Sequence, residues 1–367
     1  MIHGRLLALV LVLPACGAAL KVDTGFKADA GTGGGDAPRG AAISAPANTW
    51  TWVDFPDATC NDGSATGVGI NPGSSNNVLV FMTGGGACWD FTTCYIAKLA
   101  ATGPYGRTEF TATVSSGTPG SIVDRSAAGN PFKDWSFVYV PYCTGDIHGG
   151  DHVATYTLGS DVRTWRHVGH DNVLAYLKRL GATFPSPTRF VVAGSSAGGG
   201  GAVLNYGDFR RYWPDTKMYL LDDSLPFFVG TDVKASLSTA WETQWNLGST
   251  LEQICSNPGC LTDISGVYPA LAKRYPSDRM GFLTAEQDAV MSFFYGVSGT
   301  QFEKNLGHLT TTVLSPSPPW REFYVPGNSH TLLGAPGNFT TRNVPLWTWL
   351  TQMVTDDPAW ASEMPAP

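Results

Sequence analysis

Residues 189–207 have the sequence RFVVAGSSAGGGGAVLNYG, in which the signals for a strand, a sharp turn and a helix follow one another directly. The apolar run 190–193 is typical of a buried strand, and the small residues after the turn can begin a helix. Between them, residues 194–198 match the G-x-S-x-G turn, which holds a serine hydroxyl at the rim of a parallel sheet. This succession predicts an α/β fold with a candidate nucleophile at the turn.

The turn contains two serines, and the glycine positions distinguish them. Such a turn strains the backbone of its central residue and leaves no space for side chains two positions away on either side. Ser196 has Gly194 and Gly198 at those positions, whereas a turn centred on Ser195 would have alanines there. We therefore predict Ser196 as the nucleophile. The alternative is a Gly/Ser-rich turn without catalysis, because the short motif also occurs by chance.

Length, composition and charge limit the class of protein. The chain has 367 residues, enough for one large α/β domain or two smaller ones. It is 43% apolar and 14% charged, as expected of a globular protein. Its formal charge is −7 and the sequence has no cluster of Lys and Arg, so we expect no nucleic-acid partner.

The N-terminal residues resemble an export signal. Arg5 is followed by the apolar run 6–13, which is too short to span a membrane. The run ends at LPACG, which resembles a bacterial lipoprotein signal with Cys16 as the lipidated residue. We predict that residues 1–16 are this signal and that a lipid on Cys16 is the attachment to the cell envelope. Pro14 is unusual in such a motif, so ordinary signal-peptidase cleavage, giving a secreted or periplasmic protein, is the alternative.

Composition also divides the rest of the chain. Residues 17–48 are rich in Gly, Ala, Asp and Thr and poor in large apolar side chains, which predicts a disordered tether. From residue 49 to residue 367 the apolar and aromatic content stays high, with no second linker and no internal repeat. We expect one catalytic domain over residues 49–367, acting as a monomer.

The chain has seven cysteines, and an even number remains after Cys16. In an exported chain this number suggests three disulfides. Two pairs are close in sequence and could close small loops, which leaves a third pair, although the sequence also permits other connectivities. The pairs suggested in this way are Cys60–Cys143, Cys88–Cys94 and Cys255–Cys260. A structural metal is the alternative use, but the sequence has no C-x-x-C pair, and we expect no metal.

Short apolar runs alternate with helical patterns along the domain. Buried strands are predicted at residues 77–82, 136–140, 189–193, 217–221, 279–283 and 321–325. Apolar residues near helical spacing predict helices over 160–180 and 284–295. This alternation predicts an α/β fold with a mostly parallel central sheet and helices on both faces. In such sheets active groups collect at the carboxyl ends of the strands.

A glycine run directly follows the first of these strands, in TGGGACW at residues 83–89. Glycines there let backbone amides approach a developing oxyanion. In this architecture one donor is the amide after the nucleophile, here Ala197, and the second comes from an early loop, here Gly86 or Ala87. A merely flexible loop is the alternative, whereas a phosphate-binding loop would need a G-K-[ST] sequence that is missing.

A serine nucleophile needs a base and an orienting acid, expected in the chain order Ser, Asp, His. His330, in FYVPGNSHTLLG after the last predicted strand, is the candidate base. The carboxylate that would fix its tautomer should follow a strand between the two. We favour Asp288, after the fifth predicted strand, over Asp223, after the fourth, and each could instead cap the helix that follows it.

The loop 146–152, DIHGGDH, contains residue types that bind metals, but its spacing lacks a helical i, i+4 pattern. We predict that this loop forms a wall of the substrate pocket. A calcium or zinc site is the alternative.

With these motifs in place, the chain resembles the pectin acetylesterase family, which also includes the Notum carboxylesterases. The matching segments, in family order, are CNDGS (60–64), VLVFMTGGGACW (78–89), VYVPYCTGD (138–146), VGHDNV (168–173), VVAGSSAGGGGA (191–202), LLDDS (220–224), QDAV (287–290) and YVPGNSHT (324–331). The resemblance implies an α/β-hydrolase-like fold and hydrolysis of O-acyl esters through an acyl-enzyme, without metal or cofactor. It places the family's catalytic residues at Ser196, Asp288 and His330. Its oxyanion donors fall on Gly86, Ala87 and Ala197.

Two departures from the family pattern affect the choice of substrate. The family commonly has Trp directly after the glycine run, where this chain has Ala87 and places Trp89 two positions later. It often has Gly where this chain has Leu225. The residues expected around the pocket are Trp89, Tyr142, Asp146 and Leu225.

The expected protein is an exported bacterial serine carboxylesterase. It would remove small acyl groups, such as acetyl, from a polysaccharide such as pectin or from small esters. A lipase, a thioesterase or a polyester hydrolase uses the same motifs and is the alternative. From a different class, a surface lipoprotein could bind glycans on a degraded hydrolase scaffold.

Overall fold

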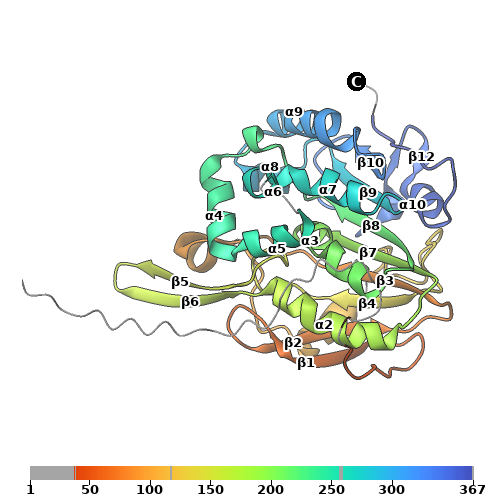
Figure 1. The fold of residues 1–367 in the computed structure, drawn as a ribbon, viewed down its shortest axis with the longest axis horizontal. Helices are drawn as coiled ribbons and strands as arrows, with labels where there is room; N and C mark the ends of the chain where they lie inside the picture. Colours follow the sequence, from red (N-terminus) through yellow and green to blue (C-terminus); the bar gives the residue numbers. More distant parts are fainter. Residues whose placement is uncertain (1–36, 38, 116–117, 256–258, 366–367) are drawn as a thin grey trace, which may run out of the picture. The chain divides into compact units, whose positions relative to one another are not determined.

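A mixed sheet forms the centre of the computed structural model, which describes residues 37, 39–115, 118–255 and 259–365. Within these residues the main sheet has the strand order β1-β2-β4-β3-β7-β8-β9-β10 (Figure 1). The strands are β1 (Thr51–Thr59), β2 (Ala65–Asn71), β3 (Asn77–Met82), β4 (Ser136–Val140), β7 (Arg189–Ser195), β8 (Lys217–Asp223), β9 (Arg279–Ala285) and β10 (Trp320–Val325). All pairs from β4 to β10 are parallel, whereas β1 and β2 are antiparallel additions at one edge. The predicted α/β class and mostly parallel sheet are confirmed, and each predicted strand is present.

Helices cover both faces of this sheet. The longer ones are α1 (Arg107–Ser115), α2 (Gly169–Thr183), α3 (Ala197–Tyr212), α4 (Ala235–Trp245), α5 (Leu247–Ile254), α7 (Val267–Arg274), α8 (Ala289–Tyr295), α9 (Gly299–Leu309) and α10 (Leu346–Val354). Short helical segments are η1 (Thr92–Ile96), η2 (Gly230–Asp232), α6 (Gly259–Thr262), η3 (Ile264–Gly266), η4 (Thr310–Leu314) and η5 (Pro336–Asn338). Among the residues described, no helix is both long and apolar enough to cross a membrane.

The alternation of side chains along the central strands explains the two helical layers. Val78, Val80 and Val192 belong to one buried cluster, which includes residues of α2, α3, α5 and α7. Leu79 and Val191, one position away, belong to a second cluster with the apolar side of α10. Because successive strand residues point to opposite faces, strands that are apolar at every position need a cover on both sides.

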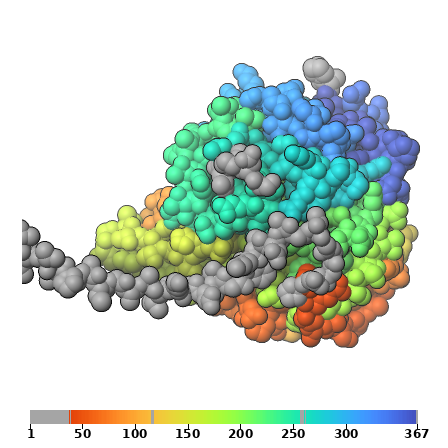
Figure 2. Space-filling model, in the orientation of Figure 1, coloured from red at the N-terminus to blue at the C-terminus, as the bar shows by residue number. Residues whose placement is uncertain are grey.

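The helix predicted over residues 160–180 is wrong in its first part. Residues 161–167 form β6 (Asp161–His167), which pairs antiparallel with β5 (His152–Leu158), and α2 begins only at Gly169. In β6 the buried residues are Trp165 and His167, two apart, while Val162 is 61% exposed. This period of two is that of a half-buried strand, and Val162 and Trp165 imitated helical spacing. The hairpin extends to one side of the sheet and forms the yellow projection in the space-filling view (Figures 1 and 2).

Two further boundaries differ from the prediction. The helix expected from residue 284 starts at residue 289, because β9 continues to Ala285 before the chain turns. The tether predicted over 17–48 is too long at its C-terminal end. The Gly40 amide donates to the Lys178 carbonyl at 2.7 Å, and the Ile43 amide donates to Thr183 Oγ1 at 2.8 Å. Backbone hydrogen bonds attach this segment to α2, and Ile43 packs against the main core. The predicted signal peptide and the predicted lipid on Cys16 lie outside the described residues.

Three disulfides join the pairs suggested by the sequence: Cys60–Cys143, Cys88–Cys94 and Cys255–Cys260. The first connects the end of β1 to the loop after β4, across 83 residues of sequence. The second connects the glycine loop after β3 to η1. The first two therefore restrain the loops at the carboxyl ends of β3 and β4.

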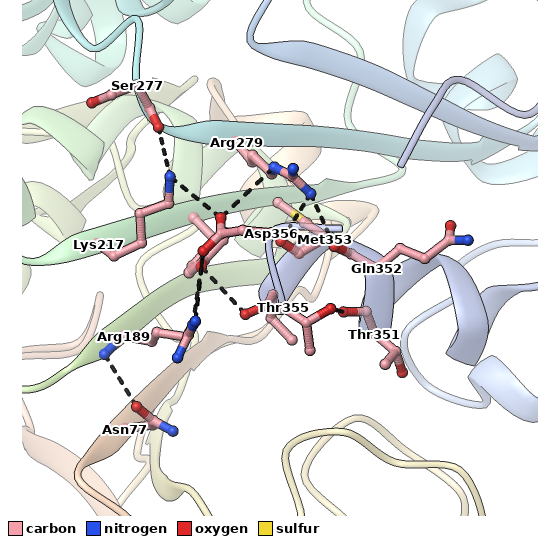
Figure 3. Close-up of polar contacts among 12 residues, drawn as sticks. Asn77, Arg189, Lys217, Ser277, Arg279, Thr351, Gln352, Met353, Thr355 and Asp356 are labelled. Atoms are coloured by element: carbon pink, nitrogen blue, oxygen red, sulfur yellow. Dashed lines mark hydrogen bonds and ion pairs between the residues drawn. The ribbon is translucent and has the colours of Figure 1, made fainter. Parts of the chain in front are cut away.

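The opposite end of the sheet is held by an ion-pair cluster around Asp356, just after α10 (Figure 3). Arg189 and Arg279, at the first residues of β7 and β9, approach its carboxylate to 3.6 and 3.8 Å, and Lys217 of β8 approaches to 3.3 Å. The hydroxyl of Tyr219 donates to the same carboxylate at 3.0 Å. The Asp356 carboxylate thus connects the end of α10 to three neighbouring strands. These contacts lie at the amino ends of the strands, whereas the candidate site lies at their carboxyl ends.

Candidate active site

Ser196 occupies the turn between β7 and α3 with the strained backbone that the motif requires. Its φ is 58° and its ψ is −128°, a region that residues with a side chain rarely adopt. A Cβ added to Gly194 would lie 1.9 Å from the Gly198 carbonyl oxygen, and one added to Gly198 would lie 2.0 Å from the Met82 carbonyl oxygen. Both glycines are therefore sterically required, and Ser196, between them, is the strained residue.

His330 and Asp288 come together from two different loops. His330 Nδ1 lies 2.7 Å from Asp288 Oδ2, and the Asp288 side chain is completely buried while that of His330 is 13% exposed. The other carboxylate oxygen, Oδ1, accepts the amides of Val290 and Met291 at 3.0 and 2.9 Å. Asp288 therefore caps α8 and also binds the imidazole, so one side chain has both of the roles considered for it. A carboxylate fixed in this way holds a single tautomer of the imidazole, with Nε2 free to accept a proton.

Asp223, the alternative acid, does not contact the imidazole in this structure. Its carboxylate accepts the Ser195 hydroxyl at 2.7 Å and the amides of Leu332 and Leu333 at 2.9 and 2.8 Å. It thus binds the residue before the candidate nucleophile and the residues just after His330.

Ser196 and His330 border the same open cavity, of about 330 Å³. Its other lining residues are Gly84, Gly85, Gly86, Ser195, Val290 and Thr331. The structure therefore brings the serine and the histidine, 134 positions apart by their residue numbers, to one solvent-accessible hollow at the carboxyl ends of β3, β7 and β10.

A second, much smaller cavity of about 20 Å³ is also lined by Ser196. It is lined by Gly86, Ala87, Ile147, Ser196, Ala197, Leu225, Trp241, Trp245, Met291 and Phe294. The three residues predicted to donate to an oxyanion are thus gathered beside the candidate nucleophile. Gly86 has a φ of 77°, and a Cβ there would lie 1.9 Å from the Leu99 carbonyl oxygen, so this position of the loop requires glycine.

Of the residues predicted around the pocket, Leu225 lines the small cavity, and Trp89, Tyr142 and Asp146 line neither. Asp146 is completely buried and accepts the Thr144 hydroxyl at 2.6 Å and the Gly169 amide at 2.7 Å, at the start of α2. The buried Tyr142 hydroxyl accepts the Ile147 amide. Asp146 and Tyr142 therefore have their polar groups satisfied inside the protein and do not face either cavity. Of the loop 146–152 that was predicted to form a pocket wall, Ile147 lines the small cavity.

The aromatic wall of the small cavity was not predicted from the sequence. Trp241 and Trp245 come from α4 and stack at 5.5 Å with an angle of 8° between their planes. Phe294 and Met291 belong to α8, directly after Asp288, so their closeness to the acid could have indicated them. No local pattern in α4 indicates that it returns to the site, because only the tertiary fold brings it there.

One group of described residues, Cys88, Cys94 and His167, has donor atoms close enough for a metal ion. The two sulfurs form a disulfide, so they are not available as thiolate ligands. The imidazole is also engaged, with Tyr156 Oη 2.8 Å from Nε2 and the Thr144 carbonyl oxygen 3.1 Å from Nδ1. This group is therefore better explained as packing around a disulfide.

The fold should be sensitive to acid because of His148, which lies in the loop 146–152. It is buried with Nε2 2.9 Å from the Thr83 carbonyl oxygen, and burial lowers its pKa to about 4. Between that pKa and the unfolded value of about 6.5 the unfolded chain binds a proton that the folded chain excludes, so stability falls as the pH falls. From pH 7 to pH 4.5 we expect His148 to account for a loss of about 2 kcal/mol.

Urea unfolding of the wild type and of His148→Gln at both pH values measures this effect. The variant should lose less stability than the wild type between the two pH values, whatever its stability at pH 7. An equal loss in both proteins would contradict the assignment to His148.

The mostly parallel sheet with helices on both faces and the strained serine turn after β7 give the protein an α/β-hydrolase-like fold. The family model described as Pectinacetylesterase matches residues 48–262, more than half of the chain, and the chain belongs to this family of carboxylic ester hydrolases. The match includes Ser196 and ends before Asp288 and His330.

Individual relatives agree with this assignment. The chain is 29% identical to pectin acetylesterase 11 of Arabidopsis thaliana over 184 residues, which are 48% of this chain and 44% of that protein. It is 30% identical to the palmitoleoyl-protein carboxylesterase Notum of Schmidtea mediterranea over 168 residues, 43% of this chain and 30% of that protein. The Drosophila melanogaster Notum is 27% identical over 196 residues, 51% of this chain and 27% of that protein. The chain thus matches less than half the length of each of these curated relatives.

Proposed function

We propose that the protein is a serine carboxylesterase that hydrolyses small O-acyl esters, in particular acetyl groups on a polysaccharide such as pectin. The observation that carries this proposal is the pair of unequal cavities that meet at Ser196. The small apolar one, of about 20 Å³, adjoins the candidate oxyanion amides, and the open one, of about 330 Å³, adjoins His330. An ester with a small acyl group and a bulky alcohol fits this arrangement.

The proposed reaction has two halves. Ser196 Oγ attacks the ester carbonyl while His330 Nε2 accepts its proton, and Asp288 stabilises the resulting imidazolium. The amides of Gly86, Ala87 and Ala197 stabilise the oxyanion of the tetrahedral intermediate. The intermediate releases the alcohol, which takes the proton from His330, and leaves an acyl-serine. Water, deprotonated by His330, then attacks the acyl-serine. Collapse of this second tetrahedral intermediate releases the acid, and His330 returns the proton to Ser196 Oγ.

The size of the small cavity favours acetyl over long acyl groups. A volume of about 20 Å³ holds little more than one water-sized group, since one such group needs roughly 10 to 15 Å³. The relatives are named for two very different acyl groups, acetyl and palmitoleoyl. In this chain the stacked Trp241 and Trp245 line the cavity and limit the length of chain that can enter.

The open cavity suits a carbohydrate alcohol more than a protein or lipid chain. Its lining includes the three glycines 84–86 together with Ser196, His330 and Thr331. Backbone amides and hydroxyls are groups that hydrogen-bond sugar hydroxyls. The disulfides fit an exported protein, and we propose a monomer that is attached to the cell envelope through Cys16 or secreted.

An acyl-length series tests this function. With p-nitrophenyl esters we expect kcat/KM to fall by more than about 100-fold from acetate to octanoate, because each methylene group that does not fit costs roughly 1–3 kcal/mol. Acetic acid should also be released from acetylated pectin or xylan. A preference for octanoate or palmitate would contradict the acetylesterase proposal and favour a lipase.

Trp241→Ala should reduce the preference for acetate, because it enlarges the small cavity. Trp89→Ala is the matched control: Trp89 contacts Trp241, with ring centres 6.2 Å apart, but lines neither cavity. This control should retain the preference. If both variants changed it equally, the wall would not determine acyl length.

A further inference from the structure

Asp223 has more hydrogen bonds than its position at the end of β8 requires. Its carboxylate is completely buried. Oδ1 accepts the Ser224 hydroxyl at 2.9 Å and the Leu332 amide at 2.9 Å. Oδ2 accepts the Ser195 hydroxyl at 2.7 Å and the Leu333 amide at 2.8 Å, and also lies 3.0 Å from the Leu332 amide. Apart from the adjacent Ser224, every donor lies within three residues of Ser196 or His330.

The backbone of Asp223 contacts the nucleophile side as well. Its carbonyl oxygen accepts the amide of Ser196 at 2.7 Å, so one residue binds both the strained turn and the loop after His330. One residue of β8 therefore links the segments that carry Ser196 and His330.

The loop that carries His330 has anchors on both sides. On its N-terminal side the carbonyl oxygens of Gly327 and Asn328 accept the amides of Gln287 and Ala289, at 2.9 and 3.2 Å, beside Asp288. On its C-terminal side the amides of Leu332 and Leu333 donate to Asp223. The C-terminal side is also held by the buried side chains of Leu332 and Leu333 and by the Leu333 carbonyl oxygen, which accepts the Ile122 amide at 3.0 Å. Asp223 differs from these contacts because it also binds the Ser196 turn.

We propose that Asp223 is a positioning residue, which holds the His330 loop and the Ser196 turn at the separation that proton transfer needs. This inference rests on the proposed esterase function. Asp223 contributes acceptor atoms in fixed places and does not touch the imidazole, in contrast to Asp288. Displacing a catalytic group by about 1 Å can cost roughly 100-fold in rate.

Two substitutions separate this role from that of a triad acid. Asp223→Asn keeps one oxygen, which can take the place of Oδ2 and accept both loop amides, so we expect kcat for p-nitrophenyl acetate to stay within about tenfold of wild type. Asp223→Ala removes both acceptors and should lower kcat about 100-fold, with KM changed less than about twofold. If Asp223 supplied the charge for the imidazolium, its Asn variant would instead lose about 10⁴-fold, as an Asp→Asn change in a triad does.

A readout that does not depend on activity follows the histidine itself. The proton between His330 Nδ1 and Asp288 should give a downfield resonance in the proton NMR spectrum, assigned by its loss in His330→Gln. We expect this resonance in wild type and Asp223→Asn, and its loss or broadening in folded Asp223→Ala. Should the Ala variant fail to fold, Asp223→Ser, which keeps one acceptor, should show the same resonance broadened and an intermediate kcat.

Asp222→Asn is the matched control. Asp222 is equally buried and adjacent, but its carboxylate accepts the Leu225 amide at 3.2 Å and the Tyr268 hydroxyl at 3.4 Å, away from the His330 loop. It should keep the His330 resonance. A wild-type kcat and resonance in folded Asp223→Ala would overturn the proposal, as would an Asn variant as inactive as Asp288→Asn. If wild type and Ser196→Ala hydrolysed esters at the same background rate, the esterase function would fail, and the NMR comparison would still decide whether Asp223 positions His330.

Discussion

Ser196→Ala should reduce kcat for p-nitrophenyl acetate by at least about 10⁴-fold, since removal of a nucleophile from a working triad costs this much or more. Ser196 has the strained backbone of the turn, lies between the two required glycines and lines both cavities. Alanine removes the hydroxyl and adds no atoms, so the fold should be preserved. Initial rates of wild type and variant at equal concentration, with circular dichroism of both, measure the effect.

The adjacent serine supplies the control for this prediction. The Ser195 hydroxyl donates to Asp223, and Ser195 does not line the small cavity. Ser195→Ala should therefore lower kcat less than about tenfold, roughly the effect of one neutral hydrogen bond. If Ser195→Ala were the inactive variant and Ser196→Ala retained its rate, the nucleophile would be misassigned. If the wild type itself hydrolysed the ester only at the uncatalysed background rate, a glycan-binding protein on a hydrolase scaffold would be the better interpretation.

Asp288→Asn should lower kcat by about 10⁴-fold with little change in stability. The amide cannot stabilise an imidazolium, and its NH₂ group favours the wrong tautomer of His330. Asparagine is nevertheless as good a helix N-cap as aspartate, so its oxygen can still accept the Val290 and Met291 amides at the start of α8. The loss of rate without a loss of fold distinguishes the acid role of Asp288 from its role as a cap.

Thermal unfolding and kinetics on the same preparation check this prediction. A midpoint close to that of wild type, together with a collapse of kcat, is the expected result. Retention of kcat within about tenfold would show that Asp288 is only a cap, because a triad Asn variant loses about 10⁴-fold. The acid would then have to be sought elsewhere, with Asp223 the nearest alternative carboxylate.

Much of the fold was predictable because it is recorded in local patterns. Buried parallel strands are apolar at every position, so β3 and β4 were predicted to the residue. The helix prediction failed at residues 161–167, where the spacing of apolar residues over a short segment fits both a helix and a strand. Val162 and Trp165 are three apart, as in a helix, yet they lie on the two faces of β6. Residues 161–167 form a strand because they pair with β5, and this pairing is not visible in the local pattern of β6.

The candidate site divides in the same way. Ser196 and its glycines form one continuous motif, because steric limits on a tight turn act between residues only two positions apart. Leu225 follows a strand end and was also expected at the pocket. Trp241 and Trp245 were not expected. They line the small cavity together with residues of α8 and of the loop after β8, and these contacts join segments that are distant in sequence. Asp146 and Tyr142 were expected at the pocket and are buried, because the loop after β4 closes its hydrogen bonds internally.

The amino-acid sequence by itself determined the class of fold, the strained turn with Ser196, and the family to which the chain belongs. Each of these depends on residues that are neighbours along the chain, where backbone sterics and side-chain alternation act directly. Only the tertiary structure decided which carboxylate contacts His330 and how large the small cavity is. Those depend on where β8, β9 and α4 end in space, and that is set by packing among segments far apart in sequence.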